Sequence, residues 1–213
     1  MERRMVKFYS KESNMLALHV IPGHFATSHS HINYYIDMSS MKSRVKEAKE
    51  AAKVLYHKNL NLPYVDTVVC MDGTEVVGGF LAECFEEGHV MSTNQHRTIY
   101  VVSPEINSNS QIIFRDNNKH MIEGKHVVLL LGSTTTGKTV RRCLECVRYY
   151  GGIVEEIASI FSVVDEVDGR KVHAIFSEED VPDYQTYEPH ECPHCARGMR
   201  IEAMVNGYGY SKL

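Results

Sequence analysis

The pattern of apolar and polar positions divides the chain into short strands and amphipathic helices. Residues 126–131 (HVVLLL) form the longest apolar run and predict a central strand, and residues 65–71 (VDTVVCM) are a second run of this kind. Residues 40–58 carry apolar side chains at helical spacing, as do 76–85 and 139–150. Further strands are predicted at 6–9, 16–21, 33–37, 88–91, 98–102, 111–114, 153–164 and 172–176, with a loop at 104–110 and an irregular tail from residue 182. Alternating strands and helices favour an α/β fold whose parallel sheet is covered on both faces.

Polar loops follow the two strongest strands. The first loop consists of Asp72, Gly73, Thr74 and Glu75, and the second spans residues 132–139 (GSTTTGKT). In parallel sheets, ligands bind beside the carboxyl ends of the strands, so these loops are candidate parts of one binding site.

The second loop matches the phosphate-binding pattern G-x-x-x-x-G-K-[ST] at every position. Glycine lets the backbone approach an anion, while amide and hydroxyl groups donate to phosphate oxygens at the start of the next helix. The candidate phosphate-binding residues are Ser133, Thr134, Thr135, Thr136, Gly137, Lys138 and Thr139. One interpretation is a P-loop nucleotide hydrolase, although no later hydrophobic strand ends in the aspartate that would hold magnesium. The alternative without function is a turn rich in serine and threonine.

Composition narrows the class of protein. The 213 residues carry a net charge of -4 and show no basic stripe, so no nucleic-acid partner is expected. No apolar run approaches the roughly 18 residues of a membrane span, and the first ten residues lack the pattern of a signal peptide. A cytoplasmic protein without a membrane partner is therefore expected.

Residues 127–140 resemble the phosphoribosyl-pyrophosphate loop of the type I phosphoribosyltransferases. In that family a hydrophobic strand and two acidic residues precede T-T-G-x-[ST], whose last part matches 135–139 here. Other segments agree in the same order. Residues 23–25 (GHF) with the later Tyr34-Tyr35 pair resemble the start of the orotate phosphoribosyltransferase hood, and 65–69 resemble the strand before its pyrophosphate loop. Residues 183–198 resemble the C-P-x-C-x-x-G tail of some prokaryotic members.

The resemblance implies a fold and its division. It implies a single phosphoribosyltransferase-like domain over 1–213, with a core at 40–180 and hood and tail elements at 1–38 and 182–213. The core would hold a central parallel sheet of about five strands flanked by helices. By the same resemblance, the protein would work as a homodimer.

The resemblance also implies an activity and its site. A phosphoribosyl group would pass from phosphoribosyl pyrophosphate to a nitrogenous base of the orotate type, with Mg²⁺ as cofactor. Residues 72–75 would form the pyrophosphate and magnesium loop. The candidate base-binding residues are Phe25, His29, His31, Tyr34 and Arg115.

Three positions depart from the family pattern. Leu131 and Gly132 stand where the family has acidic residues that contact the ribose hydroxyls, directly or through Mg²⁺, and Ser103 stands where it has a catalytic lysine. No catalytic residue is therefore assigned. One hypothesis is that Asp72 and Glu75 hold Mg²⁺ in place of the missing pair. The other is a regulatory module that binds a phosphoribosyl ligand or a nucleoside monophosphate without transfer.

The tail adds a candidate metal site. Cys192 and Cys195 form a C-x-x-C pair that suits zinc, and His190 is a candidate third ligand. The alternative is a reduced cysteine pair that holds the tail without metal.

Overall fold

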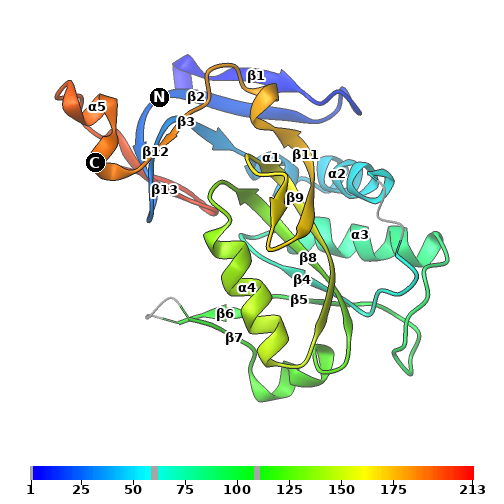
Figure 1. The fold of residues 1–213 in the computed structure, drawn as a ribbon. Coiled ribbons are helices and arrows are strands. Elements are labelled where there is room, and N and C mark those ends of the chain that lie inside the picture. Colours follow the sequence, from blue (N-terminus) through cyan, green and yellow to red (C-terminus); the bar gives the residue numbers. More distant parts are fainter. Residues whose placement is uncertain (1, 59–61, 108–110) are drawn as a thin grey trace.

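The structure is a computed structural model that describes residues 2–58, 62–107 and 111–213. Within these ranges the chain forms two six-stranded sheets and a two-stranded ribbon. Figure 1 shows a central sheet below and a second sheet above it, which we call the hood. No helix of the described residues is both long enough and apolar enough to cross a membrane.

The central sheet is parallel except at one edge. In spatial order its strands are β10 (Glu166–Val167), β11 (Arg170–Ser177), β9 (Ile153–Ser162), β8 (His126–Thr134), β4 (Thr67–Cys70) and β5 (Tyr100–Val102). Neighbouring strands from β11 to β5 are parallel, whereas β10 runs antiparallel to β11. The predicted α/β fold with about five parallel strands is therefore confirmed.

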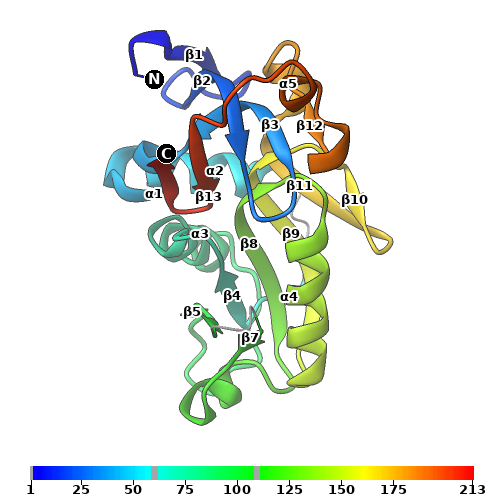
Figure 2. The ribbon, with the colours of Figure 1, turned by 90° about the vertical axis from the view of Figure 1, so that its left-hand side faces the viewer.

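Helices cover both faces of this sheet, as Figure 2 shows. One face packs against α1 (Ser39–Ser43), α2 (Val45–His57) and α3 (Glu75–Glu87), and the other against α4 (Lys138–Tyr149). Alternation along β8 explains the two cores: Val128 and Leu130 belong to the cluster shared with α2 and α3, whereas Leu129 and Leu131 belong to the cluster shared with α4. A strand that is buried on both faces reads as a continuous apolar run.

Three elements predicted within the first 110 residues differ from the structure in kind. The helix predicted at 40–58 is divided at Arg44, whose extended backbone separates α1 from α2. The strand predicted at 88–91 is an isolated bridge between Tyr64 and Met91, because Gly88 and Val90 donate to the last carbonyls of α3. The loop predicted at 104–110 contains strand β6 (Glu105–Ile106), which pairs with β7 (Ile112–Ile113), and its residues 108–110 lie outside the described ranges.

The hood joins both ends of the described chain. Its strands are β1 (Val6–Tyr9), β2 (Ala17–Ala26), β3 (His31–Asp37), β12 (Thr186–Tyr187), β13 (Ala203–Asn206) and β14 (Gly209–Lys212). The prediction of an irregular tail was wrong, since β12 pairs with β3, and β13 pairs with β2 and β14. Helix α5 (Pro193–Ala196) lies between β12 and β13. The tail strands find their partners far away in the sequence, so a local pattern does not reveal them.

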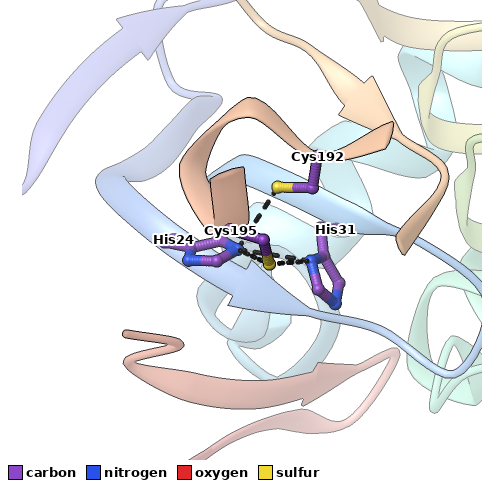
Figure 3. A group of neighbouring side chains, drawn as sticks. All are labelled: His24, His31, Cys192 and Cys195. Carbon is purple, nitrogen blue, oxygen red and sulfur yellow. Dashed lines mark hydrogen bonds between the residues drawn. The ribbon is translucent and has the colours of Figure 1, made fainter. Parts of the chain in front are cut away.

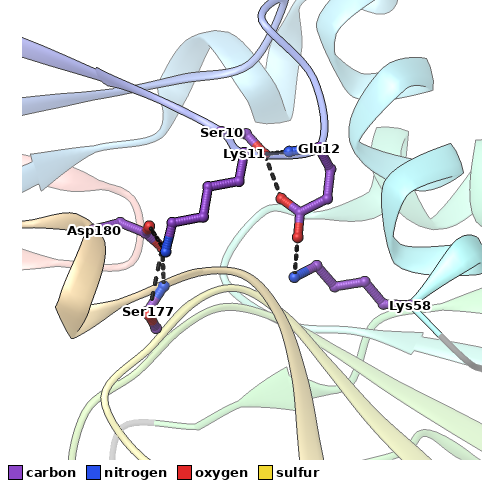
Figure 4. Close-up of polar contacts among 6 residues, drawn as sticks. All are labelled: Ser10, Lys11, Glu12, Lys58, Ser177 and Asp180. Atoms are coloured by element: carbon purple, nitrogen blue, oxygen red, sulfur yellow. Dashed lines mark hydrogen bonds and ion pairs between the residues drawn. The ribbon is translucent and has the colours of Figure 1, made fainter.

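Packing and ion pairs connect the hood to the central sheet. Phe25 and Ile32 of the hood share a buried cluster with Phe161 and Phe176 of the sheet. Figure 4 shows polar contacts beside it: Lys11 pairs with Asp180 at 2.9 Å, and Glu12 pairs with Lys58 at 2.5 Å. Partly exposed ion pairs contribute little stability, so the shared apolar core holds the two layers together.

Candidate functional site

The predicted phosphate loop lies between β8 and α4. Strand β8 ends at Thr134 and α4 begins at Lys138, so the amides of the first helical turn face the end of the sheet. Gly137 precedes the helix with a φ of 71°, and an added Cβ would lie 3.0 Å from Val167 Cγ2. Both the positive φ and the close neighbour require glycine at this turn.

A cavity of about 290 Å³ separates this loop from the hood. All seven predicted phosphate-loop residues line it, opposite a hood turn formed by residues 27–30 and a tail turn formed by residues 206–208. The hydroxyl of Thr134 is buried there without a hydrogen-bond partner among the described residues. A buried hydroxyl without a partner is rare in folded proteins, and this one belongs to the loop that lines the cavity.

Asp72 lies at the end of β4, beside the phosphate loop. Its carboxylate accepts hydrogen bonds from the amides of Gly132 and Ser133, and its φ is 58°. A Cβ added to Gly132 would lie 3.2 Å from Asp72 Cβ, so Asp72 fills the space where a side chain at 132 would begin. Burial raises the pKa of Asp72, although nearby Lys42 and the two amides act in the opposite direction.

Lys42 of α1 fixes this corner from the other side. Its ammonium group donates to the carbonyl oxygen of Asp72 at 2.8 Å and to that of Gly207 in the tail turn. The lysine therefore joins α1, the end of β4 and the tail turn, and it places a positive charge near Asp72. Its own pKa is lowered by burial.

The rest of the predicted pyrophosphate loop does not line the cavity. Gly73 has a φ of 75°, and the hydroxyl of buried Thr74 donates to Met71 O at 2.8 Å. Glu75 accepts a hydrogen bond from Ser103 Oγ at 2.7 Å, which places the residue at the family's lysine position beside a carboxylate. Leu131 is fully buried in the core that includes α4.

The predicted base-binding residues lie in different surroundings. His29 lines the cavity from the hood turn. Phe25 is fully buried, with its ring 6.2 Å from that of Tyr35, and Tyr34 packs at the edge of the same core. Arg115 lies outside the cavity lining and makes two exposed hydrogen bonds of 2.7 Å to Glu105.

Four aromatic residues that line the cavity are not among the predicted base-binding residues. Tyr35 lines it from β3, Phe161 from β9, and Tyr184 and Tyr208 from the tail. Burial raises the pKa of Tyr35 to about 12. Residues that alternate along a strand point to opposite faces, so strict alternation through Tyr34 and Tyr35 favours one of them, but the pattern alone does not say which.

The predicted cysteine pair meets two histidines of the hood. Figure 3 shows His24, His31, Cys192 and Cys195 pointing toward one another, and their ligand atoms all lie within 4.8 Å of each other. His31, a predicted base-binding residue, is thus placed in this group and not in the cavity lining. His190 lies outside the group, with a largely exposed side chain beside Glu191. Within the described residues this is the one group of three or more such ligands.

Comparisons with known proteins place the chain in a family. No model of a protein family matches the sequence. The orotate phosphoribosyltransferase of Caldanaerobacter subterraneus is 33% identical, but the match covers 37% of this chain and only 40% of that protein. The orotate phosphoribosyltransferase of Pyrococcus horikoshii is 30% identical over 70% of this chain and 74% of that protein. Among solved structures, a phosphoribosyltransferase from Corynebacterium diphtheriae is similar in fold, with a TM-score of 0.53 and 18% identity over 76% of this chain and 90% of that one. The chain therefore belongs to the orotate phosphoribosyltransferase family and has its type I phosphoribosyltransferase fold.

Proposed function

We propose that this protein transfers the phosphoribosyl group of phosphoribosyl pyrophosphate to a nitrogenous base of the orotate type. The observation that carries the proposal is the cavity that residues 133–139 and the hood turn line together. Membership of the orotate phosphoribosyltransferase family supports the same activity. A P-loop nucleotide hydrolase is not favoured by these relatives.

Two sides of the cavity suit different parts of the substrates. The amides and hydroxyls at the start of α4 suit the 5′-phosphate, since a helix N-terminus and its free amides favour an anion. The hood turn, with His29 and nearby Tyr35, suits a flat polar base. In the reaction a base nitrogen would attack C1 of the ribose while the bond from C1 to the pyrophosphate oxygen breaks, and pyrophosphate leaves.

We propose that the carboxylate of Asp72 is a ligand of Mg²⁺. Among the described residues that line the cavity it is the one carboxylate, and Mg²⁺ is commonly held by one or two carboxylates together with substrate oxygens. It fills the space beside Gly132, where the family has an acidic residue on the neighbouring strand. Bound Mg²⁺ would neutralise charge on the leaving pyrophosphate. Glu75, which lies outside the cavity lining, stays a predicted second ligand.

Two observations favour a second candidate, a module that binds the ligand without transfer. Leu131 is buried in the apolar core, and Ser103 is hydrogen-bonded to Glu75 where the family has a lysine. Electrostatic stabilisation of the leaving group is usually a large part of catalysis, and serine supplies little of it.

Calorimetry and a pyrophosphate-release assay on the same preparation separate the candidates. The transferase predicts Mg²⁺-dependent binding of phosphoribosyl pyrophosphate and release of pyrophosphate when orotate or a related base is added. Binding without release across a panel of bases would support the module. Absence of binding to phosphoribosyl pyrophosphate and to nucleoside monophosphates would contradict both.

Two further predictions concern the assembly and the location of the protein. A homodimer would be seen as twice the 24.2 kDa chain mass in light scattering. A cytoplasmic location would be tested by fractionation of the producing cells.

A further inference from the structure

Two nitrogen and two sulfur atoms converge on one point of the hood. His24 comes from β2 and His31 from the start of β3, whereas Cys192 and Cys195 flank the start of α5. His24 Nε2 lies 3.3 Å from His31 Nδ1, 3.4 Å from Cys192 Sγ and 3.7 Å from Cys195 Sγ. Cys195 Sγ is also 3.3 Å from His31 Nδ1. The four atoms thus enclose a common centre (Figure 3).

Hydrogen bonding does not account for this convergence. His24 Nδ1 lies 3.0 Å from the carbonyl oxygen of Met199, which accepts and does not donate, so the ring proton belongs on Nδ1. His24 Nε2 then carries one lone pair, and three potential donors surround it. One lone pair satisfies one of them well. If Cys195 donates instead to His31 Nδ1, that nitrogen turns its own lone pair toward His24 Nε2 at 3.3 Å, and two lone pairs at this distance repel each other.

A cation at the common centre does account for it. We propose that His24, His31, Cys192 and Cys195 bind one zinc ion with tetrahedral geometry. Zinc–nitrogen bonds of about 2.0 Å and zinc–sulfur bonds of about 2.3 Å give tetrahedral edges of about 3.3 Å between nitrogens and about 3.6 Å between nitrogen and sulfur. The observed separations of 3.3 Å and of 3.3–3.7 Å match these edges.

The surroundings also suit a structural zinc site. All four positions of the tetrahedron are protein ligands, which is the closed arrangement of structural sites. The hydrogen bond from His24 Nδ1 to Met199 O fixes the tautomer that presents Nε2 to the metal, as outer partners of zinc-bound histidines do. His190, by contrast, has a largely exposed side chain whose contact within the described residues is with Glu191.

The zinc ion would hold two walls of the cavity in place. His31 directly follows the hood turn at 27–30, and the cysteines precede the tail strands whose turn at 206–208 lines the cavity. The metal therefore links the N-terminal hairpin to the tail across 168 residues of sequence. The site itself does not depend on the proposed function, whereas its effect on base binding does.

Elemental analysis of the purified full-length chain tests the site. We expect about one zinc per chain in the wild type, loss of zinc in the Cys195→Ser variant, and retained zinc in the His190→Ala variant. The last variant is the matched control, because it removes a nearby histidine that the geometry leaves outside the site. Zinc lost with His190→Ala, or kept with Cys195→Ser, would overturn the ligand set.

A second measurement avoids the possibility that a variant fails to fold. Treating wild-type protein with a mercurial reagent in the presence of a chromogenic chelator should release about one zinc per chain, and Co²⁺ substitution should give a thiolate charge-transfer band. A wild-type protein that contains no metal and takes up neither ion would refute the site.

Removal of zinc should weaken base binding about tenfold more than phosphate binding, or ~1.4 kcal/mol. Equal weakening would refute the cavity role while leaving the metal site intact.

Discussion

Two aspartates lie at opposite ends of strand β4, and their surroundings shift the pKa of the two carboxyl groups in opposite directions. Asp66 directly precedes the strand, and Asp72 follows it by two residues. The pKa of Asp66 is lowered from its ordinary value, whereas that of Asp72 is raised. The fold thus favours the ionised form of Asp66 and disfavours that of Asp72, which lines the cavity.

Asp66 is enclosed by donors. It is fully buried and accepts hydrogen bonds from Ser92 Oγ at 2.9 Å, from Thr93 N at 2.5 Å and Oγ1 at 2.8 Å, and from His126 N at 2.9 Å. Burial alone would raise the pKa of Asp66, but the hydrogen bonds outweigh it and lower the pKa. These bonds join the loop before β5 to the amino ends of β4 and β8, so the role of Asp66 is structural.

Asp72 has fewer compensating groups. The amides of Gly132 and Ser133 and the charge of Lys42 favour its ionised form, but burial prevails and raises its pKa. A bound cation stabilises the ionised form of such a carboxylate more than that of a carboxylate already surrounded by hydrogen-bond donors. Binding groups therefore gather at the carboxyl ends of the strands, while the amino ends serve stability.

The largest predicted effect is on stability, from Asp66→Asn. An amide nitrogen would face donors, and we expect the free energy of unfolding to fall by about 3 kcal/mol at pH 7. Because the folded pKa lies below the unfolded value, the stabilisation by Asp66 is complete above the unfolded pKa and is lost as pH falls through the folded pKa. Urea unfolding at pH 7 and at pH 3 should show the deficit shrinking at the lower pH. Exposed Asp116 offers the control, and its change to Asn should have little effect; a deficit that grows at low pH would contradict the assignment.

Asp72→Asn should give the opposite result. Because the folded pKa lies above the unfolded value, ionised Asp72 lowers stability as pH rises through this range and at every higher pH. The variant should therefore unfold at neutral pH with a free energy equal to or above that of the wild type. Its Mg²⁺-dependent affinity for phosphoribosyl pyrophosphate should fall about tenfold, or ~1.4 kcal/mol. Unfolding curves and calorimetry with and without Mg²⁺ measure both; unchanged Mg²⁺ dependence would remove Asp72 from the site.

Sequence reasoning reached the groups that local pattern specifies. The phosphate loop, its strand and its helix are neighbours in the chain, so their order over 126–139 could be predicted. Strand β8 nevertheless runs to Thr134, three residues into the predicted loop, and α4 begins one residue earlier than predicted. The partners of Cys192 and Cys195 could not, because His24 lies 168 residues away and is brought there by the pairing of β13 with β2. Asp72 was recognised as a candidate, but its place beside Gly132 depends on the register of β4 against β8.

The smallest predicted effect concerns Lys138, the second charged side chain of the cavity. In a P-loop hydrolase this lysine reaches the terminal phosphates and is essential. Here Lys138 is exposed at the first turn of α4, at the variable position of the T-T-G-x-[ST] motif. An exposed charge near a phosphate contributes on the order of 1 kcal/mol, so Lys138→Met should weaken phosphoribosyl pyrophosphate binding about fivefold, and less at high salt.

Arg142→Met is the matched control, since Arg142 is exposed on the same helix but does not line the cavity. Its binding should equal that of the wild type in calorimetric titrations at low and high salt. A loss of more than about a hundredfold for Lys138→Met, or ~2.7 kcal/mol, would mean that the lysine and not the threonines and amides dominates phosphate binding. In that case the lysine would have the dominant role that it has in P-loop hydrolases, and that interpretation of the loop would have to be reconsidered.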